Sequence, residues 1–125
     1  MPTTLRDMMA AARAAVPTIV PDEVAALVAQ GKALVVDVRD GTEVQVSGKV
    51  KGALHVPRGL LEFKADPESP MYDPSFQKTK TIVLYCASGG RSALAGKTLK
   101  DMGYADVRNL GGFQDWATSG GAVER

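Results

Sequence analysis

The hydrophobic pattern of the chain alternates between short continuous apolar runs and longer segments with helical spacing. The two strongest runs are "ALVVDV", Ala33–Val38, and "TIVLY", Thr81–Tyr85. Both are rich in β-branched residues and lack polar alternation, which is typical of strands covered on both faces in a parallel sheet. Shorter runs predict further strands at Thr18–Val20, Ala53–Val56 and Asp106–Leu110.

Segments with apolar residues three or four positions apart lie between these runs and predict helices. One begins at Pro21, which suits a first helical position, and ends near Gly31. A second spans Ser92–Met102, and Gly103 follows its last turn. Weaker or shorter helices are predicted at Gly41–Ser47, at Leu60–Lys64 and around Phe113 and Trp116, and a loop is predicted from Ala65 to Lys80.

Strands that alternate with helices over 125 residues indicate one α/β domain with a mainly parallel sheet. An extra helix, Leu5–Ala15, precedes this pattern and is rich in Ala and Met. We therefore expect an N-terminal helical extension over residues 1–17 and a domain over residues 18–125. We favour a packing or docking helix at Leu5–Ala15 over a targeting segment, because charged residues interrupt its apolar positions.

The composition argues against several classes of protein. A net charge of +1 gives no basic field that would favour nucleic acid, and no run of apolar residues is long enough to span a membrane. One Cys forms no internal disulfide, and one Cys with one His cannot build a zinc site, so we expect neither a metal nor a cofactor. This cysteine usage is typical of a reducing compartment, and we expect the cytoplasm.

The main candidate for a reactive residue is Cys86, the only cysteine, which follows the second strong strand. The next residues, Ala87, Ser88, Gly89 and Gly90, are small, so their backbone N–H groups can turn toward one point. A helix begins just beyond them, and its positive end would face the same point. These surroundings favour thiolate over thiol, so we interpret Cys86 as a reactive nucleophile rather than a buried structural residue.

Two arginines near this loop have alternative roles. Arg91 could bind an anionic substrate through its planar fork, or it could pair with a carboxylate at Asp37 or Asp40; we favour the pairing. Arg58 could lie at the rim of the site and attract an anionic donor, or it could be a solvated surface residue.

Three further residues are predicted to support the site. Asp37 and Arg39 flank Val38 at the end of the first strong strand, and we favour an ion pair that fixes loops over a contact with substrate. Trp116 lies three positions after Phe113, which favours a core position, with a role as a wall that shields the sulfur as the alternative.

The motifs taken together resemble the rhodanese-like family of single-domain sulfurtransferases, from about Val20 to Val123. "VVDVRDGTEV" resembles the first signature, and "GKVKGALHVP" resembles the second. "IVLYCASGGRSALAGKTLKDMGYADVRNLGGFQDW" resembles the catalytic segment and the Gly-Gly-x-x-x-Trp ending. The resemblance implies a five-stranded, mainly parallel sheet with helices on both faces.

The resemblance also implies transfer of sulfane sulfur through a persulfide. A donor such as thiosulfate would pass its outer sulfur to Cys86, and cyanide or a thiol, including a protein thiol, would then remove it. Residues Ala87–Arg91 would form the cradle that holds the persulfide. The family often has a basic residue directly after the Cys, where this chain has Ala87, and this bears on how strongly thiosulfate is held.

Two other functions compete with this one. A rhodanese-like domain can act as a sulfur-relay or regulatory binding module without turnover of small donors, and the extra N-terminal helix motivates that alternative. Related phosphatases use a loop of the form Cys-x5-Arg, whereas four residues separate Cys86 from Arg91 here. The shorter loop therefore disfavours phosphatase or arsenate reductase activity.

Overall fold

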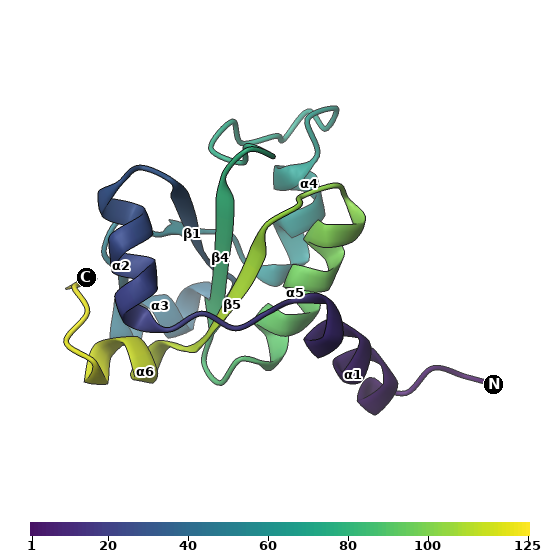
Figure 1. The fold of residues 1–125 in the computed structure, drawn as a ribbon, viewed down its shortest axis with the longest axis horizontal. Helices are drawn as coiled ribbons and strands as arrows, with labels where there is room; N and C mark the ends of the chain where they lie inside the picture. Colours follow the sequence, from purple (N-terminus) through teal and green to yellow (C-terminus); the bar gives the residue numbers. More distant parts are fainter.

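The computed structural model describes residues 1–125 and has a parallel four-stranded sheet in the order β3-β1-β4-β5 (Figure 1). β1 pairs with β3 and with β4, and β4 pairs with β5, all in parallel. The carboxyl ends of the strands therefore share one edge of the sheet, where ligands bind in folds of this kind.

The elements follow one another along the chain as strands alternating with helices. In order they are α1 (Leu5–Ala15), α2 (Pro21–Ala29), β1 (Ala33–Asp37), α3 (Gly41–Ser47), β2 (Lys49–Val50), β3 (Leu54–His55), the 3-10 turn η1 (Arg58–Leu60), α4 (Leu61–Ala65), β4 (Thr81–Cys86), α5 (Gly90–Asp101), β5 (Val107–Gly112), α6 (Phe113–Thr118) and β6 (Val123–Glu124).

Helices cover both faces of the sheet and bury two apolar clusters. In Figure 1, α1, α4 and α5 lie on one side of the strands, and α2 and α6 lie on the other. Side chains of β4 alternate between the clusters, because successive residues of a strand point to opposite faces. Leu84 and Cys86 thus belong to the cluster under α5, and Val83 and Tyr85 belong to the cluster with α2 and α6.

The structure confirms the predicted α/β class and most of the predicted elements, with differences at the edges of the sheet. The predicted strand at Thr18–Val20 is only a parallel bridge from Thr18 to Asn109, so the regular sheet has four strands rather than five. Sequence reasoning also missed β2 and β6, a two-residue antiparallel pair. Strands this short carry no hydrophobic periodicity that could reveal them.

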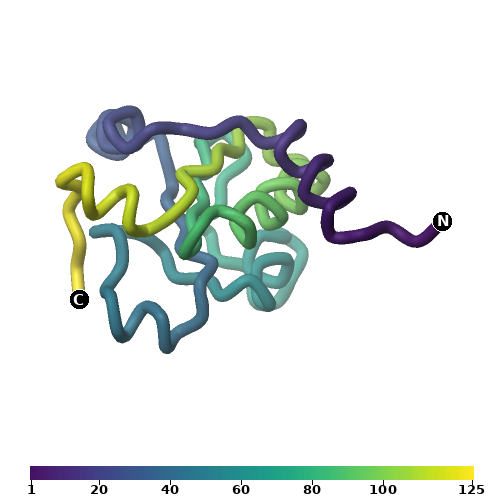
Figure 2. The backbone as a smooth tube through the Cα atoms, turned by 90° about the horizontal axis from the view of Figure 1, so that it is seen from below, coloured from purple at the N-terminus to yellow at the C-terminus, as the bar shows by residue number.

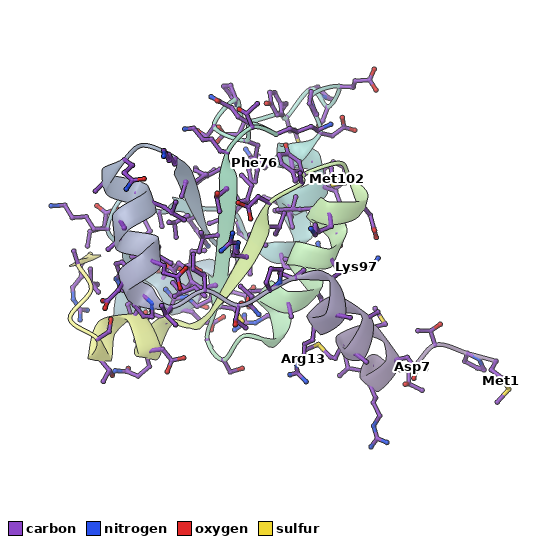
Figure 3. The ribbon with its side chains drawn as sticks, viewed as in Figure 1. Met1, Asp7, Arg13, Phe76, Lys97 and Met102 are labelled. Carbon is purple, nitrogen blue, oxygen red and sulfur yellow. The ribbon has the colours of Figure 1, made fainter.

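The predicted N-terminal helix packs on α5. α1 begins at a capping box in which Thr4 accepts from the Asp7 N–H and Asp7 accepts from the Thr4 N–H, each at 3.1 Å. Ala12 is buried, whereas Asp7 and Arg13, labelled in Figure 3, are exposed. Figure 2 shows α1 at the opposite end of the molecule from the C-terminus. No helix of this chain combines the length and the apolar character needed to cross a membrane.

The contact between Val16 and Gly96 provides a test of how tightly the N-terminal segment docks. A Cβ at Gly96 would lie 2.9 Å from both γ-methyl carbons of Val16, and Val16 is a short, stiff, buried side chain. Gly96→Ala is therefore expected to destabilise the protein by about 1–3 kcal/mol, although Ala normally stabilises a helix interior. The measurement is the free energy of unfolding in urea. Restored stability in Gly96→Ala/Val16→Ala would confirm the contact, and a stabilised single variant would contradict it.

Candidate active site around Cys86

Cys86 is the last residue of β4 and lies at the carboxyl edge of the sheet. The loop that follows it is at the lower end of the strands in Figure 1, where it leads into α5. The side chain of Cys86 is 1% exposed and faces the cluster under α5, while Ala87 and Ser88 are exposed above it. The sulfur therefore lies at the base of a short loop of small residues.

The backbone of the loop turns toward the sulfur. The Gly89 N–H donates a hydrogen bond to Cys86 Sγ with an N–S distance of 3.0 Å. Gly89 has a φ of 100°, a left-handed conformation that glycine adopts without a steric penalty, and it caps α5. The predicted inward-turned N–H group is thus present, and the positive end of α5 lies directly behind it.

A second glycine lets the end of β5 approach the loop closely. A Cβ at Gly112 would lie 2.6 Å from the Ala87 carbonyl oxygen, closer than any real side chain approaches a backbone atom. Gly112 also pairs with Cys86 in the sheet register. The Gly111-Gly112 pair therefore forms a side-chain-free wall against which the cysteine loop rests.

Ser92 and Asn109 connect Cys86 to β5. The Ser92 hydroxyl lies 3.4 Å from Cys86 Sγ and donates to Asn109 Oδ1 at 2.8 Å. Asn109 Nδ2 donates to the Gly89 carbonyl at 3.1 Å, which orients Oδ1 toward Ser92. A serine hydroxyl has one proton, so it can accept from a Cys86 thiol while it donates to Asn109, or turn and donate to a thiolate.

These contacts change how readily the Cys86 thiol ionises. Burial opposes the charged form, but hydrogen bonds from the Ser92 side chain and from the backbone of Ser92, Ser88 and Gly89 outweigh burial and lower the pKa of Cys86 below its ordinary value. Cys86 is a free thiol. It therefore has the electrostatic surroundings of a nucleophile rather than those of an inert core cysteine.

Ser92→Ala tests the largest of the contributions that lower this pKa. Without the hydroxyl, the pKa of Cys86 is expected to rise, so the thiolate appears at higher pH than in the wild type. The measurement is the rate of Cys86 alkylation by iodoacetamide against pH. Ser88→Ala is the matched control, because it removes an exposed hydroxyl but keeps the backbone N–H. An unchanged midpoint in Ser92→Ala would contradict the assignment.

Arg91 pairs with a carboxylate, as favoured from the sequence, but the partner predicted there is wrong. Its Nη1 and Nη2 donate to the two carboxylate oxygens of Glu43 at 2.7 and 3.0 Å, and not to Asp37 or Asp40. These hydrogen bonds lower the pKa of Glu43 to about 2 and raise the pKa of Arg91. Glu43 reaches the loop from the first turn of α3, which follows β1 at the same edge of the sheet.

The predicted ion pair between Asp37 and Arg39 is present and buried. Arg39 Nη2 and Nε donate to Asp37 Oδ2 at 2.7 and 3.1 Å, and the two side chains are 4% and 0% exposed. Arg39 also donates to the Gly48 carbonyl at 2.8 Å and lies 4.5 Å from the centre of the Phe113 ring. The pair thus ties β1 to the end of α3 and to the start of α6, which fixes loops at the carboxyl edge.

Two other predicted site residues lie elsewhere. Arg58 donates to Glu62 at 2.9 Å and to Thr98 at 3.1 Å. Thr98 is eight residues along α5 from Gly90, or about 12 Å at 1.5 Å per residue, so Arg58 does not line the cysteine loop. Trp116 is a core residue of the cluster on the opposite face from Cys86, and its Nε1 donates to the Ala122 carbonyl at 2.8 Å, so the wall alternative is wrong.

Sequence reasoning missed Glu43, Ser92 and Asn109 as members of the site. Glu43 had a local signal, because Asp40 followed three residues later by Glu is a capping pattern, and the Asp40 N–H does donate to Glu43 at 3.2 Å. Asn109 had none, because its contact with the loop depends on β5 lying next to β4.

Comparison with known proteins identifies relatives along most of the chain. Residues 20–119 match the sequence model of the rhodanese-like domain. The chain is similar to a human thiosulfate:glutathione sulfurtransferase, with 29% identity over 82% of this chain and 95% of that protein. It is also similar to the thiosulfate sulfurtransferase PspE of Escherichia coli, with 35% identity over 66% of this chain and 72% of that protein.

A solved structure matches the whole architecture, including the N-terminal helix. It is a protein of unknown function from Rhodopseudomonas palustris, described as a possible tyrosine phosphatase. The identity is 40%, the TM-score is 0.87, and the match covers 99% of both chains.

Proposed function

Because this chain belongs to the family of rhodanese-like domains, we propose that it is a sulfurtransferase that carries sulfane sulfur on Cys86. The donor is of the thiosulfate type, and the acceptor is a small thiophile such as cyanide or a thiol, including one on a protein. The lone free thiol suits the reducing cytoplasm, where we place the reaction.

In the first step the Cys86 thiolate attacks the outer sulfur of the donor. With thiosulfate, a new S–S bond forms at Cys86 while the S–S bond of the donor breaks, and sulfite leaves with the electron pair. The products are a Cys86 persulfide anion and sulfite, so charge is conserved. The Gly89 N–H and the start of α5 stabilise the negative charge on the Cys86 sulfur before the attack.

In the second step the acceptor attacks the outer sulfur of the persulfide. Cyanide takes that sulfur as thiocyanate, and the Cys86 thiolate leaves and is stabilised again by the same donors. The chain has no second cysteine that could resolve the persulfide internally, so the acceptor comes from outside. Two half-reactions through one covalent intermediate predict ping-pong kinetics.

One observation carries this proposal: the sulfur of Cys86 accepts the Gly89 N–H at 3.0 Å. This contact and those of Ser88 and Ser92 outweigh burial and lower the pKa of Cys86. The family match and the two named sulfurtransferases support the reaction class. The spacing of four residues from Cys86 to Arg91, together with the engagement of Arg91 by Glu43, argues against binding of a tetrahedral phosphate.

The test is steady-state formation of thiocyanate from cyanide and either thiosulfate or methanethiosulfonate. A sulfurtransferase gives thiocyanate with a ping-pong pattern. A binding module without turnover gives none with either donor, and a phosphatase instead hydrolyses an aryl phosphate in a parallel assay. Absence of thiocyanate with both donors would overturn the proposal.

A further inference from the structure

The charge at the mouth of the cysteine loop is balanced rather than positive. Arg91 follows the loop directly, and both of its terminal nitrogens are held by the two carboxylate oxygens of Glu43. The side chains of Arg91 and Glu43 are 38% and 33% exposed, so the pair lies at the surface and not in the core. Arg91 lies in the first turn of α5, two residues after Gly89, whose N–H donates to the Cys86 sulfur.

Arg39 and Arg58, which follow β1 and β3, do not replace Arg91. The guanidinium of Arg39 is buried against Asp37, and that of Arg58 is held by Glu62 and Thr98. The position directly after the nucleophile is Ala87, which has no charge. The loop thus offers backbone N–H groups to an anion, but none of these three arginines presents a free fork.

The number of negative charges on the donor therefore matters at this site. Thiosulfate is a dianion whose three outer oxygens need compensation, and a bidentate arginine would supply it. Glu43 occupies that fork and adds its own negative charge next to the cysteine loop. Because hydrogen bonds from Arg91 keep the pKa of Glu43 at about 2, this charge is present throughout the neutral range.

We propose that Glu43 is a specificity-determining residue, which withholds Arg91 from dianionic donors and makes the loop favour a sulfane donor with a single negative charge. This inference rests on the proposed sulfur transfer and names the class of donor. Alkanethiosulfonates and organic persulfides belong to this class.

The chemical step is the same for a singly charged donor. With methanethiosulfonate, the Cys86 thiolate attacks the outer sulfur, the S–S bond of the donor breaks, and methanesulfinate leaves with the electron pair. Two negative charges enter and two leave, as persulfide and sulfinate. Methanethiosulfonate differs from thiosulfate by a methyl group in place of one charged oxygen, so the two donors form a matched pair of probes.

Glu43→Gln is the direct test, because glutamine keeps the size and an acceptor for the Asp40 N–H but removes the charge. The quantity compared is kcat/KM for thiosulfate divided by kcat/KM for methanethiosulfonate. In Glu43→Gln this ratio is expected to rise about two- to fivefold over the wild type, the effect of one partly exposed charge contact. In Glu43→Gln/Arg91→Gln the rise of this ratio should disappear, because the double variant has no Arg91 guanidinium to bind the donor.

Glu62→Gln is the matched control, since it frees Arg58 from an equivalent carboxylate away from the loop. The donor ratio is expected to stay at the wild-type value in this variant. An unchanged ratio in Glu43→Gln, or an equal rise in Glu62→Gln, would overturn the inference.

A second readout separates this inference from the sulfur-transfer proposal. Iodoacetate and iodoacetamide alkylate Cys86 by the same reaction but differ by one negative charge. The ratio of their rates is expected to rise about threefold or more in Glu43→Gln, whether or not the protein transfers sulfur. If no donor loads Cys86 with sulfur, the proposed function fails, and the alkylation ratio alone then supports or overturns the role of Glu43.

Discussion

Cys86→Ser is expected to lower sulfur transfer at least about a thousandfold, to the background of the uncatalysed reaction, because the nucleophile forms the only covalent intermediate. A serine hydroxyl in the same position keeps the Gly89 N–H and Ser92 as hydrogen-bond partners but forms no oxyanion at neutral pH. The measurement is the rate of thiocyanate formation with each donor.

The control for Cys86→Ser is a measurement of whether the variant still folds. Cys86 is 1% exposed, and serine is smaller than cysteine and is polar, so a modest loss of stability is expected without a change of structure. Urea unfolding and circular dichroism would show a folded protein with a cooperative transition. A folded Cys86→Ser protein that still turns over would contradict the role assigned to the sulfur.

Asp37→Asn is expected to destabilise the protein by about 3–5 kcal/mol, because it leaves the buried guanidinium of Arg39 without its counter-charge. Asp37 is fully buried and accepts from Arg39 Nε and Nη2 and from the Arg39 N–H. An asparagine side chain replaces one acceptor oxygen by an NH2 group that faces these donors. The measurement is the free energy of unfolding in urea.

The exposed pair between Lys97 and Asp101 supplies a control with the same chemical change. Asp101 is 65% exposed on the last turn of α5, and its oxygens lie 2.8 and 2.9 Å from Lys97 Nζ. Asp101→Asn should cost less than about 1 kcal/mol, because solvent screens a surface pair. Equal losses of unfolding free energy in Asp37→Asn and Asp101→Asn would show that the pair of Asp37 and Arg39 stabilises the fold no more than a surface pair does.

The central part of the fold could be predicted from the sequence because its signals are local. The continuous apolar runs at Ala33–Val38 and Thr81–Tyr85 correspond to β1 and β4, the middle strands of the sheet. The predicted ends of the strands were less accurate. β5 was predicted to end at Leu110, since two glycines are typical of a turn, but Gly111 and Gly112 remain paired with Tyr85 and Cys86.

The candidate site likewise combines features that are local in sequence with contacts that depend on the fold. The position of Cys86, the small loop and the helix behind it are adjacent in sequence, so their relation to one another was predictable. The partner of Arg91 was not, because it depends on how far a side chain reaches from the first turn of α3. Asp37 and Asp40 are the partners predicted from the sequence, but Arg39 occupies Asp37, and Arg91 pairs with Glu43 rather than with Asp40.

The alternative that placed Arg58 at the rim of the site is wrong for a related reason. Pro57 and the following turn place Arg58 near the middle of α5 rather than at its start, and the sequence contains no signal for that direction. Trp116 was predicted correctly as a core residue. Its indole packs under Gly121, where a Cβ would lie 2.2 Å from the ring, and that contact directs it away from Cys86.

Intact mass spectrometry tests the central claim most directly. The protein is incubated with methanethiosulfonate or thiosulfate, freed of excess donor, and weighed before and after addition of cyanide. The account predicts a gain of one sulfur atom on Cys86, its complete removal by cyanide, and no gain in Cys86→Ser. A wild-type protein whose mass stays unchanged with both donors would contradict the account.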